Sequence, residues 1–289
     1  ADFLILEAGL GGRLDATNVV RKTLLNIVTP ISFDHQEFLG KNLFKITNEK
    51  LGIIKNNSNI IIANQRKDLN LYIKKKLKNN KNKKYFYNTH YKILEKRKKT
   101  FLFKFLKKKY KFNIPLLIGD HQIDNASTAL AAIFTLKRIG YSIFNKKINI
   151  GITKTKWPGR LEKFKMKSTT IYLDGAHNID GAKKLLKFFQ DKNVKVWLVI
   201  GMLNNKNIYE FLKILKPTLY GVIAVKIPGE NNSFTTKNIS KFCNKLKLIC
   251  WERQSINHLN NFILTKIKPE TLLISGSLYL VGKIRTKYL

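Results

Sequence analysis

The sequence predicts an α/β protein made of two units, each with a mainly parallel sheet and helices on its faces. Short apolar runs typical of strands alternate with helical segments along the chain, and this order produces parallel sheets. The length of 289 residues fits two domains of ordinary size. An apolar content of 44% is sufficient for packed cores.

The elements of the first unit are expected in residues 1–155, and the chain opens on a strand at residues 2–6. The next segments are read as strand 24–31, helix 44–54, strand 59–63 and helix 68–77. An Ala-rich helix follows at 124–136, with Asp124 or Asn125 near its N-cap. We expect the domain boundary within 150–165.

A Lys-rich segment interrupts this alternation at about residues 79–115. Phe101, Phe103 and Phe105 recur at every second position, which predicts an exposed antiparallel strand over 100–110 and one arm of a hairpin. Lysines with interleaved aromatics are also found where proteins bind single-stranded nucleic acid. We favour a solvated hairpin whose lysines protect its edges.

The second unit, residues 156–289, repeats the strand and helix alternation. Strands are expected at 169–173, 194–200, 220–225, 246–251 and 271–275, and helices at 180–189 and 208–215. Polar loops follow several of these strands, at 174–178, 201–207 and 276–277. Open α/β sheets bind ligands at such loops, so they are candidate site segments.

The net charge is +37, from 55 basic and 18 acidic residues, which raises the question of a nucleic-acid partner. Eight of the basic residues are Arg and the rest are Lys, whereas base readout relies on Arg. We therefore interpret the charge as a compositional bias and expect no specific nucleic acid. Cys243 and Cys250 match no metal or redox motif, no apolar run approaches a membrane span, and we expect a cytoplasmic protein.

Three early stretches combine residue types that can hold a metal ion. EAGLGGRLDATN (7–18) places the Glu7 carboxylate after a strand and before glycines that allow close approach of a ligand. Asp34 and His35 follow the next strand, and Lys50 lies on the helix beyond. A tight turn, a structural histidine and a surface lysine are the alternative readings.

Later turns offer groups for anions and amines. The motifs are HQIDN (121–125), PGRLE (158–162), DGAHN (174–178) and GMLNNKN (201–207). Arg160 suits a phosphate oxygen, and Asp174 and His177 share one loop that can meet a hydroxyl, an amine or a carboxylate. Each motif alone is also compatible with an ordinary capped turn.

Taken in order, these motifs together with NEKLGI (48–53) and SGSLYLVG (275–282) resemble the folylpolyglutamate synthase/dihydrofolate synthase family. The resemblance spans the chain and implies a Mur-ligase-type central ATPase domain, residues 1–155, followed by a Rossmann-like C-terminal glutamate ligase domain. It also implies an ATP-dependent carbon–nitrogen ligase of folate metabolism that uses Mg²⁺. Asn205 and Asn207 depart from the family, which often carries Asp there.

The resemblance implies a role for each matching residue. Glu7 and His35 match magnesium ligands, and Lys50 matches a lysine that becomes a carbamate and positions a second metal. Leu14, Asp15 and Ala16 match a pterin-contacting stretch. Asn125, Arg160 and Asp174 match ATP-binding positions, while His177 and Ser277 match residues near the incoming glutamate. Lys50, Asp174 and His177 are the catalytic candidates.

The implied reaction phosphorylates a pterin or folate carboxylate with ATP, and L-glutamate then attacks the acyl phosphate. The family also carries a GxxGKG[ST] phosphate loop, which these 289 residues do not contain. We therefore expect an N-terminally truncated chain without ligase turnover of its own, belonging to a protein that is monomeric at full length. A basic RNA-binding module and another Mur-type or cyanophycin-type ligase remain the alternatives.

Overall fold

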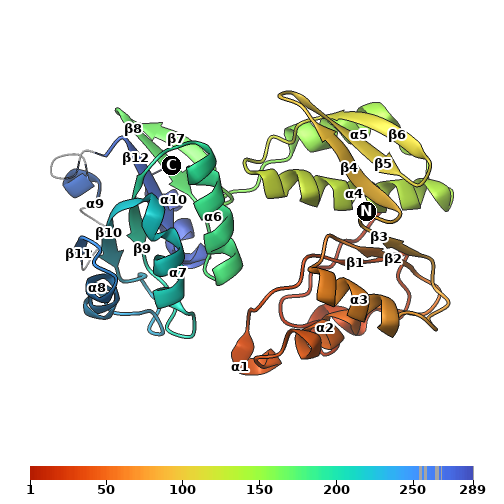
Figure 1. Cartoon of the computed structure of the whole chain (residues 1–289), viewed down its shortest axis with the longest axis horizontal. Coiled ribbons are helices and arrows are strands. Elements are labelled where there is room, and N and C mark those ends of the chain that lie inside the picture. Colours follow the sequence, from red (N-terminus) through yellow and green to blue (C-terminus); the bar gives the residue numbers. More distant parts are fainter. Residues whose placement is uncertain (254–255, 257–258, 264–266, 268, 289) are drawn as a thin grey trace. The chain divides into compact units, whose positions relative to one another are not determined.

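The structure is a computed structural model that describes residues 1–253, 256, 259–263, 267 and 269–288. Contacts within the chain divide it into two compact units (Figure 1). Unit 1 comprises Ala1–Leu116 and Asp120–Thr155, and unit 2 comprises Leu117–Gly119 and Lys156–Leu289. The α/β fold class expected from the alternation is confirmed in both.

The parallel sheet of unit 1 has the order β1 (Leu25–Val28), β2 (Asn59–Ile62) and β3 (Lys84–Phe86). Helices α2 (Leu43–Leu51) and α3 (Lys67–Lys76) pack on one face through a core that includes Ile46, Ile60 and Leu69. The long helix α4 (Asp120–Arg138) contacts β2 on the other face. Short helices η1 (Ala16–Val19) and α1 (Gln36–Leu39) lie in the loops that precede β1 and α2.

The Lys-rich segment forms an antiparallel sheet of β4 (Tyr91–Lys96), β5 (Thr100–Phe105) and β6 (Lys108–Asn113). Phe101, Phe103 and Phe105 are buried and face α4, where the Phe134 ring stacks on those of Phe103 and Phe105 at 5.9 and 5.7 Å. The single exposed strand expected over 100–110 is wrong in two respects: the chain turns at 106–107 and forms two strands, and the three phenylalanines are buried in the core. Helix α5 (Asn145–Lys154) contacts β6.

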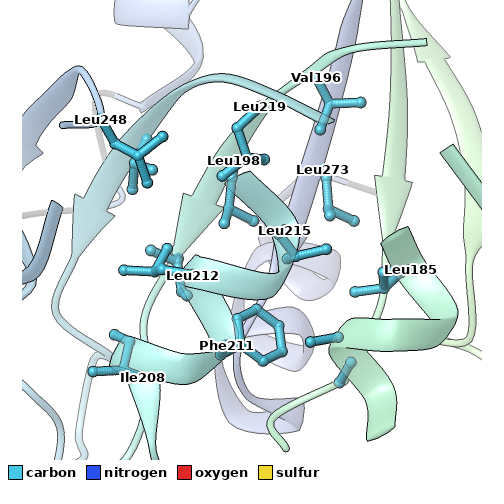
Figure 2. Close-up of a cluster of buried hydrophobic side chains, with 14 of the residues drawn as sticks. Leu185, Val196, Leu198, Ile208, Phe211, Leu212, Leu215, Leu219, Leu248 and Leu273 are labelled. Atoms are coloured by element: carbon cyan, nitrogen blue, oxygen red, sulfur yellow. The ribbon is translucent and has the colours of Figure 1, made fainter. Parts of the chain in front are cut away.

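The sheet of unit 2 is parallel except at one edge. Its order is β11 (Cys250–Arg253), β10 (Leu219–Val225), β9 (Val196–Ile200), β12 (Thr271–Ser275), β8 (Thr169–Leu173) and the antiparallel β7 (Glu162–Met166). The face in Figure 2 is covered by α6 (Ile179–Asp191), α7 (Ile208–Leu215), which runs on into η2 (Lys216–Thr218), and α8 (Thr236–Lys245). Helices α9 (Leu259–Phe262) and α10 (Leu278–Tyr288) cover the other face.

Apolar side chains explain why the helices of unit 2 dock where they do. Helix α7 carries Phe211, Leu212 and Leu215 on one side, and all three are fully buried against β9 and β10 (Figure 2). Burying one such side chain contributes about 1.5–3 kcal/mol, so this short helix is held by its packing.

Three expected boundaries are wrong. Residues 2–6 form no strand, because no neighbouring strand pairs with them, and Ile5 remains 90% exposed. Helix α4 begins at Asp120, so Asp124 and Asn125 lie inside it rather than at its N-cap. The strand expected at 246–251 begins only at Cys250, because α8 extends to Lys245 and Lys247 then adopts a left-handed conformation.

Within the described residues, no helix has both the length and the apolar character needed to cross a bilayer.

Candidate functional site

Unit 1 contains a cavity of about 660 Å³ beside the glycine-rich loop. Leu14, Asp15 and Ala16, which the resemblance assigned to the pterin, all line it. The lining residues come from the loop, from α1 and from α2: Leu10, Gly11, Gly12, Arg13, Leu14, Asp15, Ala16, Phe38, Leu39, Lys45, Asn48 and Glu49. The volume lies in the range of small-molecule sites.

Asp15 organises the loop that forms this wall. Its carboxylate accepts hydrogen bonds from the Leu10 N–H (2.8 Å), the Thr17 N–H (2.9 Å) and the Thr17 hydroxyl (2.6 Å). These bonds, with that from the Thr17 hydroxyl foremost, lower the pKa of Asp15 to about 2. Asp15 also caps η1, so the carboxylate is committed to holding the loop in shape.

Two glycines allow the loop to dock directly on α2. A Cβ at Gly12 would lie 2.8 Å from the Glu49 carbonyl oxygen and 3.2 Å from the Lys50 Cα. A Cβ at Gly52 would overlap Arg13, whose backbone N–H donates to the Glu49 carbonyl at 2.8 Å. The motifs 7–18 and 48–53, which are separate in the sequence, thus pack directly against each other next to Lys50.

The cavity presents both apolar and charged groups to a ligand. Leu14 and Phe38 are 79% and 70% exposed, so their apolar surfaces are accessible to a ligand. The charged groups are Lys45 and an ion pair in which Arg13 Nε lies 3.2 Å from Glu49 Oε1. Such a surface suits a flat molecule with apolar faces and polar edges. Arg13, Phe38 and Glu49 were not predicted as site residues from the sequence. The available signal for Arg13 and Glu49 was the pair of glycines, Gly12 and Gly52, that allow their two segments to come into contact.

The candidate metal ligands all lie in unit 1, on three different segments of the chain. Glu7 is exposed, His35 lies at the N-cap of α1 in a left-handed conformation (φ 49°), and Lys50 is half-buried in the last turn of α2. In the part of the chain that the structure describes, no three His, Cys, Asp or Glu side chains gather around a metal position. A protein site for Mg²⁺ commonly supplies one or two carboxylates and leaves the rest to water and phosphate.

In unit 2, three loops meet at the ends of β8 and β12. Asp174, 8% exposed, accepts the Leu161 N–H at 2.9 Å and the Ala176 N–H at 2.8 Å. The Gly175 N–H donates to the Gly159 carbonyl at 2.8 Å, and the Gly276 N–H donates to the Ala176 carbonyl at 3.0 Å. Burial raises the pKa of Asp174 above its usual range, although the two N–H donors act in the opposite direction.

Glu162 braces the turn that carries Arg160. Its Oε2 accepts the Gly159 N–H at 3.0 Å, and both of its oxygens accept from Arg285 Nε of α10, at 3.1 and 3.2 Å. Arg160 is exposed and acts electrostatically on Asp174. Glu162 and Arg285 were not singled out from sequence, because 123 residues separate them.

The other predicted residues are placed as follows. His177 donates from Nδ1 to the Gly175 carbonyl at 2.9 Å, which fixes its tautomer. Ser277 accepts the Tyr279 N–H at 3.1 Å and so begins α10. Asn207 caps α7 through the Glu210 N–H at 3.1 Å, a bond that Asp would also make. Asn125 is exposed on α4 of unit 1, whereas Arg160 and Asp174 belong to unit 2.

Both units match known protein families. Residues 1–133 match the Mur ligase middle domain, and residues 159–277 match the Mur ligase glutamate ligase domain. Among solved structures, E. coli FolC in complex with DHPP and ADP is 26% identical, with a TM-score of 0.84 over 97% of this chain and 64% of that one. Folylpolyglutamate synthase of Mycobacterium tuberculosis, 23% identical, shares the fold with a TM-score of 0.83, covering 97% of this chain and 67% of that one.

Curated relatives support the same family assignment. Dihydrofolate synthase/folylpolyglutamate synthase of Bacillus subtilis is 30% identical over 99% of this chain and 67% of its own length. A probable dihydrofolate synthetase of Schizosaccharomyces pombe is 30% identical over 96% of this chain and 69% of its own length. The chain thus spans about two thirds of each relative. By sequence and fold, the chain belongs to the dihydrofolate synthase/folylpolyglutamate synthase family of Mur-type, ATP-dependent glutamate ligases.

Proposed function

We propose that this chain carries the substrate-binding and glutamate-ligating parts of an enzyme that adds L-glutamate to dihydropteroate, to folates or to both. The observation that carries the proposal is the cavity walled by residues 10–16 and docked on α2 through Gly12 and Gly52. The pterin ring would lie between apolar groups such as Leu14 and Phe38, with its polar edge toward Lys45 and Asn48.

Three residues are proposed to act in nucleotide binding: Asn125 on α4, and Arg160 and Asp174 in unit 2. Arg160 binds a phosphate oxygen, and Asn125 contacts the nucleotide from α4. Asp174 acts mainly by holding the loops 159–161 and 174–176 in place, since its oxygens accept two backbone N–H groups. Relatives solved with ADP and AMPPCP support ATP as the co-substrate.

Glu7 and His35 would hold Mg²⁺, with Lys50 as a carbamate helping to place a second ion. The Glu7 carboxylate and a Lys50 carbamate are oxygen donors that suit this hard cation, whereas the His35 imidazole is a softer nitrogen donor. The remaining ligands would be water and phosphate oxygens. A bound ion offsets negative charge that develops on phosphoryl oxygens.

The proposed reaction has two steps. The substrate carboxylate attacks the γ-phosphorus of ATP and gives an acyl phosphate and ADP. The amine of L-glutamate, held near His177 and Ser277, then attacks the acyl carbon, phosphate leaves and the amide forms. Arg160 offsets the charge on the transferring group.

We further propose a cytoplasmic, monomeric enzyme, and no turnover by these 289 residues alone, because they contain no phosphate loop to bind the β- and γ-phosphates. An assay of ATP-dependent glutamate addition tests this directly. Turnover by the 289-residue chain would contradict the requirement for a phosphate loop.

Calorimetric titration with dihydropteroate tests the binding site without requiring turnover. We expect binding by the wild-type chain that weakens about tenfold in Phe38→Ala, which removes an apolar wall. A Phe144→Ala variant, which also removes a largely exposed phenylalanine but outside the cavity, should bind as the wild type does. Equal affinity in all three proteins, or binding of another Mur-type substrate in preference to pterins, would contradict the proposal.

A further inference from the structure

We propose that the outward face of the β4–β6 sheet, the face turned away from α4, binds the phosphate backbone of a nucleic acid without reading its bases. The proposal is independent of the ligase site and shares no residue with the cavity. Its first basis is the density of basic residues in this segment. Ten of the 23 residues 91–113 are basic and one is acidic, whereas the other 266 residues contain 45 basic ones. The overall compositional bias therefore does not account for this segment.

The strand register gathers part of this charge into one row. Lys104 lies between the buried Phe103 and Phe105, so it projects from the outward face. Lys92 of β4 and Lys109 of β6 are its directly opposed partners on either side. We call Lys92, Lys104 and Lys109 the lysine row.

The lysine row is electrostatically unfavourable in the isolated protein. Neighbouring strands lie about 4.8 Å apart, and like charges directly opposite each other destabilise a sheet. The single carboxylate of the segment, Glu95, is committed to an ion pair with Arg97 at 2.6 Å. An anionic polymer laid across the sheet would relieve this repulsion through several phosphates at once.

The orientation of the aromatic rings selects the kind of contact. Phe101, Phe103 and Phe105 point into the core, and Tyr110 packs on Phe134 with ring centroids 4.2 Å apart. The outward face therefore offers bases no stacking platform, and Lys binds phosphate as a point charge. A lipid surface would require several apolar side chains that insert into it. Beside the lysine row the face offers Leu102 and, at the bulge of β4, Leu94, which is less apolar surface than such insertion needs.

Fluorescence anisotropy with labelled 20-nucleotide U, A and C homopolymers tests the proposal across a salt series. Variant one replaces the lysine row by glutamate: Lys92→Glu, Lys104→Glu and Lys109→Glu. The matched control, Lys237→Glu, Lys241→Glu and Lys245→Glu, makes the same charge change on exposed positions of α8. A Lys→Gln triple at the lysine row serves if the glutamates impair folding.

We expect wild-type binding at 100 mM salt with equal affinity for the three homopolymers. The lysine-row variant should bind about tenfold more weakly, and its log–log salt slope should fall by about 2, the contribution of three phosphate contacts on a single strand. The control should change less than threefold. Equal losses in both variants would assign binding to diffuse charge and overturn the proposal. Base preference, absence of binding, or tighter lysine-row-dependent binding to anionic lipid vesicles would overturn it as well.

Discussion

The loop sites of the two units each rely on a carboxylate that accepts backbone N–H groups, Asp15 in unit 1 and Asp174 in unit 2, but they differ in what else holds the loop. In unit 1, Gly12 and Gly52 also let residues 10–16 lie directly on α2, so that Leu14 and Phe38 remain available to a ligand. In unit 2, a second carboxylate, Glu162, accepts the Gly159 N–H and pairs with Arg285, and Arg160 is exposed. A carboxylate in one of these motifs can therefore hold a loop in shape as well as bind a ligand.

Replacing Asp174 by Ala should have the largest effect on stability. Two buried N–H groups, those of Leu161 and Ala176, would lose their acceptor, at about 1–3 kcal/mol each. All three tryptophans, Trp157, Trp197 and Trp251, lie in unit 2, so Trp fluorescence during urea unfolding reports this unit. Asp174→Asn, which keeps one acceptor oxygen, should lose about half as much. Equal midpoints for wild type and Asp174→Ala would show that water replaces the carboxylate.

Gly52→Ala tests the backbone docking of unit 1. The new Cβ would overlap Arg13, and such overpacking costs about 1–3 kcal/mol. Dihydropteroate binding should weaken in parallel, since Arg13 lines the cavity. The control is Gly151→Ala on α5, where a Cβ meets open space. Because unit 1 contains no Trp, hydrogen exchange of residues 10–18 is the suitable measurement. Unchanged exchange in Gly52→Ala would contradict the proposed docking.

In both units the sequence predicted the helices and strands better than the contacts between distant residues. Alternating apolar patterns located most helices and strands, because burial imposes those periods on the chain. The contact between Arg13 and Glu49 and that between Glu162 and Arg285 left no local trace, since they depend on tertiary packing. The strand expected at residues 2–6 failed for the same reason: pairing, and not composition, makes a strand. The family motif predicted a pterin contact for Leu14, Asp15 and Ala16, and this stays a prediction, whereas Phe38 became a candidate only when the fold showed it lining the same cavity.

Glu162→Gln should have a smaller and more local effect. The ion pair with Arg285 is partly exposed and contributes about 0–1 kcal/mol, and the bond from the Gly159 N–H adds a similar amount. We expect little change in the unfolding midpoint but exchange of the Gly159 amide that is about 3–10-fold faster, corresponding to loosening of the turn beneath Arg160. Glu210→Gln, which breaks the exposed pair with Lys213 on α7, should leave this amide unchanged. Equal exchange in both variants would exclude Glu162 as a brace.

The smallest predicted effect is a difference in acid response between the two carboxylates. The pKa of Asp15 is lowered to about 2 in the folded chain, so its stabilising contribution is complete above the usual value of 3.8 and is lost as the pH falls toward 2. The pKa of Asp174 is raised, so protonation favours its folded state and its contribution declines as the pH rises through the folded value. Asp15→Asn should therefore flatten the acid dependence of hydrogen exchange in residues 10–18 between pH 4 and 2. Asp174→Asn should instead remove a loss of stability that the wild type shows as the pH rises, and Trp fluorescence of unit 2 measures this stability. The same trend at both sites would mean that general charge repulsion, at a net charge of +37, outweighs the local hydrogen bonds that distinguish them.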